Sequence, residues 1–263
     1  MLTSRPVALV TGASAGIGKE LARRFARGGH DLVLTARRVD ELQTLADELR
    51  SAGATAHVFP ADLSDPAAPR KLFDEVAAAG LAVDVLVNNA GFGVYGKFAD
   101  ADPDRLLAMV RVNVLALTEL TRLFIPGMVA RGRGRVLNVA STAAFQPGPL
   151  MAGYYATKAY VLSLSEALAH ELRGTGVTVT CLCPGPTRTE FAAVAAAEGT
   201  KLFDNPNVTD AGPVADAGYR ATMRSRRVVI PGVLNRLGAF ATRFVPRTVL
   251  MRIVERIQAK RRR

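Results

Sequence analysis

The stretch RPVALVTGASAGIG, Arg5 to Gly18, decides the fold of this chain. An apolar run typical of a buried strand passes directly into glycines, and an amphipathic pattern typical of a helix follows. This order of strand, glycine turn and helix lets a pyrophosphate reach the helix N-terminus, where free backbone N–H groups bind anions. The glycines, Gly12, Gly16 and Gly18, are spaced GxxxGxG. We therefore predict a dinucleotide-binding unit at the start of the chain.

The alternation of strands and helices continues along most of the sequence. We predict further strands over 31–36, 55–60, 83–88, 135–140, 177–184 and 227–230, and helices over 40–52, about 66–79, 106–124 and 154–172. Helical segments of this length between strands indicate βαβ crossovers and a parallel sheet with both faces covered. A length of 263 residues suits one large domain. The sequence predicts an α/β fold, a doubly wound parallel sheet of Rossmann type in a single domain, residues 1–263.

The end of the second strand favours NADP(H). A fold that prefers NAD places an acid there to bind the ribose 2′-hydroxyl, whereas one that prefers NADP supplies arginine for the 2′-phosphate. Here Ala36 is followed by Arg37 and Arg38. The alternative is that one or both arginines, Arg38 more readily, begin the solvated face of the next helix.

Catalytic chemistry is predicted for the stretch STAAFQPGPLMAGYYATK, Ser141 to Lys158. Tyr154 and Lys158 are four residues apart, so phenol and ammonium project from one face of a helix. A positive charge beside a phenol favours phenolate, which lets a tyrosine exchange protons with an alcohol or carbonyl. Tyr155 has the wrong offset for this pairing. YxxxK on its own is common and usually marks a plain helix face.

Three further polar positions have two interpretations each. Asp62 follows the third strand and either accepts a hydrogen bond from an adenine amino group or caps the next helix. The stretch NNAG, 88–91, ends the fourth strand, where glycine permits close approach of a ligand and the amides tie strands together. Asn113 lies within a predicted helix, where an amide is usually exposed or bonded to backbone. The apolar face of that helix comprises Leu106, Leu107, Val110, Val114, Leu117, Leu120 and Phe124.

Together these motifs resemble the short-chain dehydrogenase/reductase family. The matching features are TGASAGIG at 11–18, Asp62-Leu63, NNAG at 88–91, Asn113, Ser141, YYATK at 154–158 and PGPTRT at 184–189. The resemblance implies a catalytic set of Asn113, Ser141, Tyr154 and Lys158. Ser141 would bond the substrate oxygen and Tyr154 would exchange its proton. Lys158 would bind the nicotinamide ribose and lower the pKa of the tyrosine, and Asn113 would hold a water that connects Lys158 to solvent.

The same resemblance, together with the two arginines, implies the cofactor site. Its expected residues are Gly12, Ser14, Ala15, Gly16, Ile17, Gly18, Arg37, Arg38, Asp62, Leu63, Asn89, Ala90, Gly91, Tyr154, Lys158, Pro184, Gly185, Thr187 and Thr189. No metal site is predicted. We expect an NADP(H)-dependent oxidoreductase that reduces a ketone or oxidises a secondary alcohol, with the cofactor supplying the redox chemistry.

The substrate is expected to be lipophilic, such as a 3-oxoacyl chain or a steroid. A pocket is predicted from Phe92, Val94, Phe145, Met151, Phe191 and Phe203. A mobile lid is predicted over about 186–213, with a turn at Asn205-Pro206-Asn207. The alternatives are a reductase of small polar ketones or sugars, and a non-catalytic NADP-binding sensor or membrane-surface scaffold.

Basic charge is concentrated in the tail. Residues from Arg220 onward carry a net charge of +12, whereas residues 1–219 carry −1. We predict two basic amphipathic helices over about 232–263. Their apolar stripes comprise Val233, Leu234, Leu237, Phe240 and Phe244, and then Val249, Leu250, Ile253, Val254 and Ile257. These stripes are expected to pack on the body or on a second subunit.

The basic face of the tail has an alternative role, resting on an anionic membrane or receiving an acidic carrier such as coenzyme A or acyl carrier protein. Nucleic acid is not an expected partner, since the chain has no tryptophan and its tail phenylalanines follow the apolar stripe. The family resemblance suggests a homodimer or homotetramer, formed through the helices that begin near Leu106 and Tyr154.

The remaining features of the sequence concern the cellular compartment in which the protein is expected. Cys181 and Cys183 are expected to be buried thiols in a reducing compartment. The sequence shows neither a signal sequence nor an uninterrupted apolar stretch of about 18 residues. We expect a cytoplasmic protein, with peripheral membrane association as the alternative that the tail allows.

Overall fold

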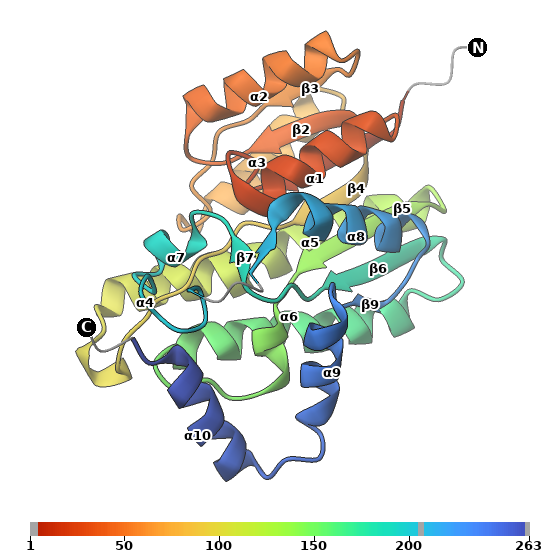
Figure 1. Cartoon of the computed structure of the whole chain (residues 1–263). Coiled ribbons are helices and arrows are strands. Elements are labelled where there is room, and N and C mark those ends of the chain that lie inside the picture. The colour runs from red at the N-terminus through yellow and green to blue at the C-terminus, as the bar shows by residue number, and fades with distance from the viewer. Residues whose placement is uncertain (1–4, 205–207, 261–263) are drawn as a thin grey trace.

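Seven strands form the central sheet: β1 (Val7–Thr11), β2 (Asp31–Thr35), β3 (Ala56–Val58), β4 (Val83–Asn88), β5 (Gly134–Val139), β6 (Val177–Leu182) and β9 (Val228–Val229). They are parallel throughout, in the order β3-β2-β1-β4-β5-β6-β9 (Figure 1). The order reverses between β1 and β4, where doubly wound sheets open a crevice for ligands. This computed structural model describes residues 5–204 and 208–260. The predicted turn at 205–207 and the last three arginines lie outside the described residues.

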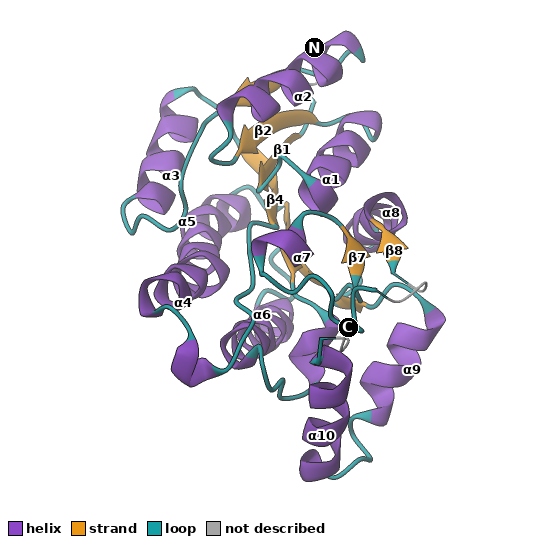
Figure 2. Cartoon of the chain, turned by 60° about the vertical axis from the view of Figure 1, so that its left-hand side comes forward, coloured by secondary structure: helices purple, strands orange, loops and turns teal. Residues whose placement is uncertain are grey.

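Helices cover both faces of the sheet (Figures 1 and 2). The helices of the described residues are α1 (Gly16–Arg27), α2 (Val39–Ser51), α3 (Ala68–Ala78), α4 (Pro103–Val110), α5 (Leu117–Ala130), α6 (Ala152–Glu171), α7 (Phe191–Val194), α8 (Ala211–Met223), α9 (Val233–Ala241) and α10 (Arg247–Gln258). Alternate strand residues point to opposite faces. Val10 and Leu34 pack among α1, α2 and α8, whereas Leu9 and Val33 pack among α3, α5 and α6. The predicted doubly wound sheet is confirmed.

The helix predicted over 106–124 is not regular. A π-helical turn, Arg111–Ala116, joins α4 to α5 and contains Asn113. Its wider winding rotates α4 by about 100° relative to an unbroken helix. Leu107 and Val110 are therefore exposed, and Met109 is buried instead. The prediction of one continuous apolar face is wrong at these two positions.

The same run, Pro103–Ala130, is long and apolar enough to cross a membrane when judged by length and composition alone. Glu119 and Arg122 interrupt its apolar residues. Leu120, Phe124 and Met128 are buried against the sheet. The apolar residues of this run are therefore explained by its packing against the sheet.

The segment predicted as a lid contains short regular elements. β7 (Thr187–Arg188) pairs with β8 (Thr209–Asp210), and α7 lies between them in the sequence. Residues 211–213, predicted as the end of the lid, form the first turn of α8. α8 packs on α1, where the rings of Phe25 and Tyr219 lie 5.1 Å apart.

The two cysteines lie side by side at the end of β6. Cys181 and Cys183 are buried free thiols with sulfur atoms 3.7 Å apart. Burial and the neighbouring thiol raise the pKa of Cys183 well above its ordinary value. Both residues therefore pack as small apolar side chains, as predicted from their spacing.

A buried row of polar side chains ties the sheet to α5 and α6. Asn88 donates from Nδ2 to Thr121 Oγ1 of α5 and to Asn138 Oδ1 of β5, each at 2.9 Å. Asn138 donates from Nδ2 to Ser165 Oγ of α6, also at 2.9 Å. Buried polar groups are costly without partners, so each side chain specifies the position of the next.

Replacing Asn138 with alanine should remove the centre of this row. Asn88 would lose an acceptor and Ser165 a donor, so we expect Asn138→Ala to lower the free energy of unfolding by about 1–3 kcal/mol. Urea denaturation measures the change. The control is Gln43→Ala, which removes an exposed amide that bonds Asp47 within α2 and should change stability by less than about 0.5 kcal/mol. Equal effects of both variants would contradict the role of the row.

Candidate functional site

The carboxyl ends of the strands open into a cavity of about 620 Å³. One half is lined by the glycine turn after β1, and the other by residues of α6, α7 and α10. The predicted site residues that line it are Gly12, Ser14, Ala15, Gly16, Ile17, Arg37, Arg38, Asp62, Leu63, Asn89, Ala90, Gly91, Ser141, Tyr154, Lys158, Pro184, Gly185, Thr187 and Thr189. Gly18 and Asn113 do not line it.

The glycine turn is shaped for an anion. α1 begins at Gly16 without an acidic residue in its first turn, and Ala15 before it makes no side-chain capping bond. The first N–H groups of α1 are therefore left for a negatively charged ligand. Gly12 and Gly16 have left-handed backbone with φ of +64° and +53°. A Cβ on Gly18 would lie 2.2 Å from the carbonyl oxygen of Gly12. The turn fits a dinucleotide pyrophosphate, and Gly18 serves the close packing of helix on turn.

Two predicted cofactor residues also support this turn. Asn89 donates from Nδ2 to the carbonyl oxygens of Thr11 and Gly12, at 2.9 and 3.3 Å. Thr189 packs against the other side, since a Cβ on Gly16 would lie 2.9 Å from Thr189 Cγ2. Segments far apart in sequence therefore hold the shape of the anion site.

The two arginines after β2 lie at the mouth of the cavity and are exposed. Arg38 pairs with Glu190, Nη2 to Oε2 at 3.0 Å, and donates to Ser14 Oγ at 3.4 Å. Within the described residues, Arg37 makes no hydrogen bond or ion pair. Arg38 therefore points to the cavity mouth rather than simply starting the face of α2. Glu190 was not predicted as a site residue.

Asp62 uses one oxygen to order its own loop. Its Oδ1 accepts hydrogen bonds from Ser64 N at 3.0 Å and Ser64 Oγ at 2.7 Å. Burial acts to raise the pKa of Asp62, but the bonds from Ser64 and the charge of Arg37 hold it below its ordinary value. Asp62 therefore does not cap α3, which begins at Ala68; its Oδ1 orders the turn before that helix, and the residue also lines the cavity.

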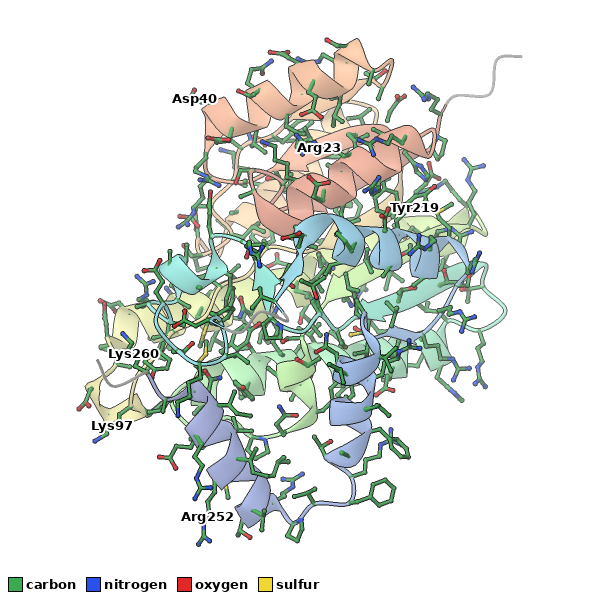
Figure 3. All side chains as sticks on the ribbon, viewed as in Figure 1. Arg23, Asp40, Lys97, Tyr219, Arg252 and Lys260 are labelled. Carbon is green, nitrogen blue, oxygen red and sulfur yellow. The ribbon has the colours of Figure 1, made fainter. Side chains whose placement is uncertain are left out.

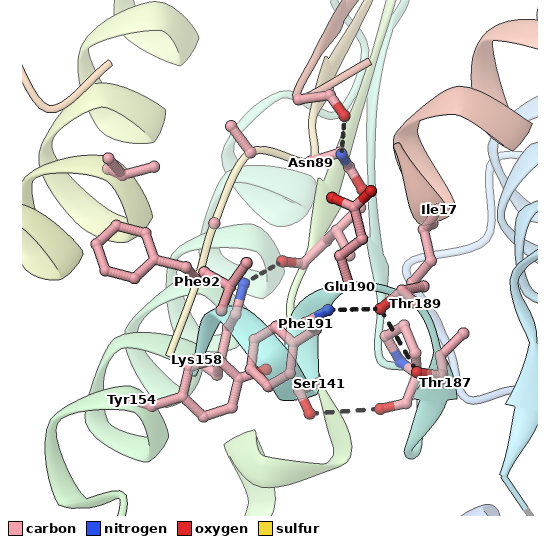
Figure 4. A pocket seen from close by; sticks show the side chains of 18 of the residues that line it. Ile17, Asn89, Phe92, Ser141, Tyr154, Lys158, Thr187, Thr189, Glu190 and Phe191 are labelled. Carbon is pink, nitrogen blue, oxygen red and sulfur yellow. Dashed lines mark hydrogen bonds between the residues drawn. The ribbon is translucent and has the colours of Figure 1, made fainter. Parts of the chain in front are cut away.

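Ser141, Tyr154 and Lys158 converge where the end of β5 meets α6 (Figure 4). The hydroxyl of Ser141 donates to the carbonyl oxygen of Pro184 at 3.4 Å, a long bond. Lys158 donates from Nζ to the carbonyl oxygen of Val139 at 2.8 Å, and this Nζ lies 5.8 Å from the centre of the Tyr154 ring. The predicted spacing of Tyr154 and Lys158 therefore brings both side chains to one place.

Burial shifts both titrating groups toward their neutral forms. It raises the pKa of Tyr154, an effect that a hydrogen bond with Ser141 only partly offsets. It lowers the pKa of Lys158 to about 8. Lys158 was expected to lower the pKa of Tyr154. In this structure burial of the phenol is the largest influence, and the pKa of Tyr154 is raised.

Asn113 supports the site from behind. Its Nδ2 donates to the carbonyl oxygen of Phe92 at 2.9 Å and to Thr157 Oγ1 at 3.1 Å, and its Oδ1 accepts from Phe92 N at 3.1 Å. A Cβ on Gly91 would lie 2.9 Å from Asn113 Oδ1 and 3.3 Å from Lys158 Nζ. Glycine is therefore required where the amide and the ammonium approach the chain.

The half of the cavity beside Tyr154 is mainly apolar. Phe92, Met151, Phe191 and Phe203 line it as predicted. Phe145 packs beside Val161 instead, and Val94 lies behind the wall, so these two predictions are wrong. Sequence reasoning missed Val194, Leu202, Val254, Ile257 and Gln258, which complete the wall from α7, the following loop and α10.

The sequence from residue 6 to residue 199 matches the family model described as short chain dehydrogenase. The chain belongs to the short-chain dehydrogenase family. It is 40% identical over 190 residues to the NADP-dependent 3-hydroxy acid dehydrogenase YdfG of Salmonella typhi, which covers 72% of this chain and 75% of that protein. This dehydrogenase is therefore an oxidoreductase built on a Rossmann-type sheet.

Solved structures extend the similarity to the whole dehydrogenase. A short-chain dehydrogenase from Sphingobium yanoikuyae in complex with NADPH is 35% identical, with a TM-score of 0.82 over 97% of this chain and 98% of that one. A 7β-hydroxysteroid dehydrogenase is 27% identical, with a TM-score of 0.85 over 95% and 96%. Another solved relative is in complex with NAD.

The tail stripes of this dehydrogenase were expected to pack on the body or on a second subunit; Val254 of α10 packs on the body, and the stripe of α9 does not. α9 and α10 project beyond α6 in both views (Figures 1 and 2), and Arg252 of α10 lies far from the sheet (Figure 3). The apolar stripe of α9 and of the turn after it is 56–72% exposed and comprises Val233, Leu234, Leu237, Phe240 and, in the turn, Phe244. In α10, Val254 and Gln258 are buried. One tail helix thus reaches the cavity, while the other leaves its apolar face uncovered by the described residues.

Proposed function

We propose that this dehydrogenase reduces a lipophilic ketone to a secondary alcohol with NADPH, using Tyr154 as the proton donor. The observation that carries the proposal is the convergence of Tyr154, Ser141 and Lys158 in the apolar half of a cavity whose other half fits a dinucleotide. A ketone bound between these halves would have its oxygen beside two hydroxyls.

Each side chain of the site has its own role in the proposed reaction. NADPH, when bound, supplies the hydride. The Ser141 hydroxyl accepts from Ala143 N at 3.1 Å and donates only a long bond, to the carbonyl oxygen of Pro184, so its proton would turn to the ketone oxygen. Tyr154 gives its proton to the same oxygen, and the ammonium of Lys158 stabilises the phenolate left behind. Asn113 keeps the main chain of Phe92 in place and, as the family resemblance implies, holds a water on the path to Lys158.

The proposed direction is reduction. A proton donor must be protonated, and burial raises the pKa of Tyr154, so the phenol keeps its proton at neutral pH. Oxidation of an alcohol requires the phenolate. The charge states near neutral pH therefore favour the ketone as substrate.

The variant Tyr154→Phe tests the mechanism. It keeps the ring and loses the proton, so ketone reduction should fall by about 10²- to 10⁴-fold while the Kd for NADPH stays unchanged. Steady-state kinetics and a fluorescence titration measure the two quantities. Tyr219→Phe, which alters the contact of α8 with α1, serves as the matched control and should stay active. Unchanged turnover in Tyr154→Phe would exclude the mechanism.

The pH profile of the unmodified enzyme provides a second check. Burial lowers the pKa of Lys158 to about 8, so the ammonium loses its proton as the pH rises through that value. Reduction should be level below about pH 8 and fall above it, because the neutral amine no longer stabilises the phenolate left by proton transfer. A reduction rate that stays level to pH 10 would contradict the assigned role of Lys158.

We propose NADP(H) rather than NAD(H) as the cofactor. Support comes from Arg37, which has no partner within the described residues, and from Arg38 at the same mouth. Guanidinium groups suit a 2′-phosphate because they donate several parallel hydrogen bonds to it. YdfG uses NADP, and the Sphingobium structure contains NADPH.

Replacing both arginines should change the cofactor preference. For Arg37→Ser with Arg38→Ser we expect the KM for NADPH to rise at least about tenfold, with little change for NADH, because only NADPH carries the 2′-phosphate. The control is Arg70→Ser, which removes an exposed arginine paired with Asp74 on α3. Equal changes for both cofactors would count against the phosphate site.

The lipophilic class is supported by the aromatic wall beside Tyr154. A reductase of small polar ketones or sugars would need more polar groups in that wall. A non-catalytic NADP-binding sensor would not need the four catalytic side chains. NADPH consumption with 3-oxoacyl thioesters, steroids, aryl ketones and short polar ketones separates the three. Binding of NADPH without turnover of any of them would favour the sensor.

We propose two partner surfaces. The exposed Leu107, Leu115 and Tyr160, on α4, the π-helical turn and α6, support a homodimer or homotetramer through these helices. The apolar stripe of α9, flanked by Arg236 and Arg243, supports a surface for anionic lipid. Self-pairing of the tail would bring like charges together, which favours a negatively charged occupant. Peripheral membrane association is thus part of the proposal.

Vesicle binding tests the tail. The unmodified protein should sediment with vesicles of phosphatidylcholine and phosphatidylglycerol and remain free with phosphatidylcholine alone. Phe240→Ser with Phe244→Ser should weaken sedimentation at least about tenfold, because two large apolar side chains leave the interface. Phe98→Ser, an exposed phenylalanine outside the tail, is the control. No sedimentation, together with a lower native mass for the tail variant, would show a subunit interface instead.

A further inference from the structure

Gln258 is an unusual residue for a basic amphipathic tail. It lies at the end of α10, where Arg252 and Arg256 are exposed, yet it is 0% exposed and lines the cavity. Burial of an amide is unfavourable unless it is hydrogen-bonded. Its side chain therefore has a specific partner within the body.

The partner of Gln258 is the second tyrosine of YYATK. Gln258 Nε2 donates to the hydroxyl of Tyr155 at 2.8 Å. The main-chain carbonyl oxygen of Gln258 accepts a hydrogen bond from the hydroxyl of Tyr95 at 2.9 Å. Lys260 Nζ lies 5.4 Å from the centre of the Tyr95 ring. Lys201 N donates to the carbonyl oxygen of Ala259 at 3.3 Å. The last turn of the tail is thus joined to α6, to the loop after β4 and to the segment after α7.

These contacts fix one wall of the cavity. Two residues of α10 line the cavity beside Gln258: Val254, one helical turn earlier, and Ile257, the residue directly before it. Val249, Ile253 and Ile257 are more than two-fifths exposed, whereas Val254 and Gln258 are buried. Most of α10 therefore has little contact with the body, and the hydrogen bonds of Gln258 and Ala259 carry the attachment. Since Tyr155 follows Tyr154 directly in α6, the attachment sets the wall relative to the proton donor.

The side-chain amide of Gln258 serves to position α10 more than to stabilise the fold. Gln258 Oε1 is buried and accepts no hydrogen bond from the described residues. An apolar side chain of similar size would avoid that unpaired acceptor. Burial, opposed by the bond from Gln258, raises the pKa of Tyr155, so this tyrosine stays neutral and acts as a fixed hydrogen-bonding group.

We propose that Gln258 is a specificity-determining positioning residue, which holds α10 as the end wall of the cavity and so determines how well bulky ketones bind near Tyr154. The inference rests on the proposed reductase function. A short aliphatic ketone would not reach Val254 and Ile257, whereas a diaryl ketone would contact them. Loss of the bond should therefore affect the KM for the bulky ketone and leave kcat nearly unchanged.

The experiment compares Gln258→Met, Tyr155→Phe and their combination. Methionine keeps the length of glutamine, and phenylalanine keeps the ring, so each removes one side of the bond. For a diaryl ketone we expect the KM to rise about tenfold in each single variant with kcat within twofold, and little change for a short aliphatic ketone. The combination should be no worse than one single variant, because both remove the same bond. Arg252→Gln, on the exposed face of α10, should behave as the unmodified enzyme.

Two readouts that do not depend on turnover complete the test. Amide hydrogen exchange over 248–259 should become faster in Gln258→Met and Tyr155→Phe and stay unchanged in Arg252→Gln. Calorimetric titration of the diaryl ketone in the presence of NADP+ should show weaker binding in the same two variants. Equal losses for both ketones, or unchanged exchange over α10, would overturn the inference. An unmodified protein that binds the diaryl ketone, shows these differences and turns over no ketone would overturn the proposed function alone.

Discussion

The hydrogen bond from Asn88 to Asn138 is the constraint on which the site depends. It joins β4 to β5 inside the sheet, and the further bonds of these two amides to Thr121 and Ser165 place α5 and α6. A buried amide row tolerates little displacement, because any shift leaves polar groups unpaired. The two helices positioned in this way deliver the amide behind Phe92 and the tyrosine and lysine of the site.

The second physical theme is exclusion of water. Burial keeps the phenol of Tyr154 protonated and weakens the hold of Lys158 on its proton. Lys158 stays charged near neutral pH, and the carbonyl oxygen of Val139 is its hydrogen-bond partner. In the mechanism we propose, the two groups take opposite parts in one proton transfer. The apolar wall that excludes water from them also defines which ketones would bind well, so reactivity and specificity share one cause.

The main elements of the fold and much of the site follow from local patterns. Short apolar runs bounded by glycine predicted β1 and β4 within two residues, and the spacing of Tyr154 and Lys158 predicted their meeting in α6. Most cofactor residues implied by the family resemblance line the cavity, because the carboxyl ends of parallel strands meet at one edge. Local signals suffice here since each motif lies on a single strand end or helix face.

The sequence by itself thus determined the parallel sheet, the glycine turn and the helical face that carries Tyr154 and Lys158. Only the tertiary structure decided what covers each apolar face. The π-helical turn exposes Leu107, α9 leaves its stripe uncovered, and Gln258 meets Tyr155 across 103 positions of the chain. Periodicity shows that a helix has an apolar side, but the partner of that side depends on how distant segments pack. The end wall of the cavity, and with it the selectivity we infer, arises from that packing.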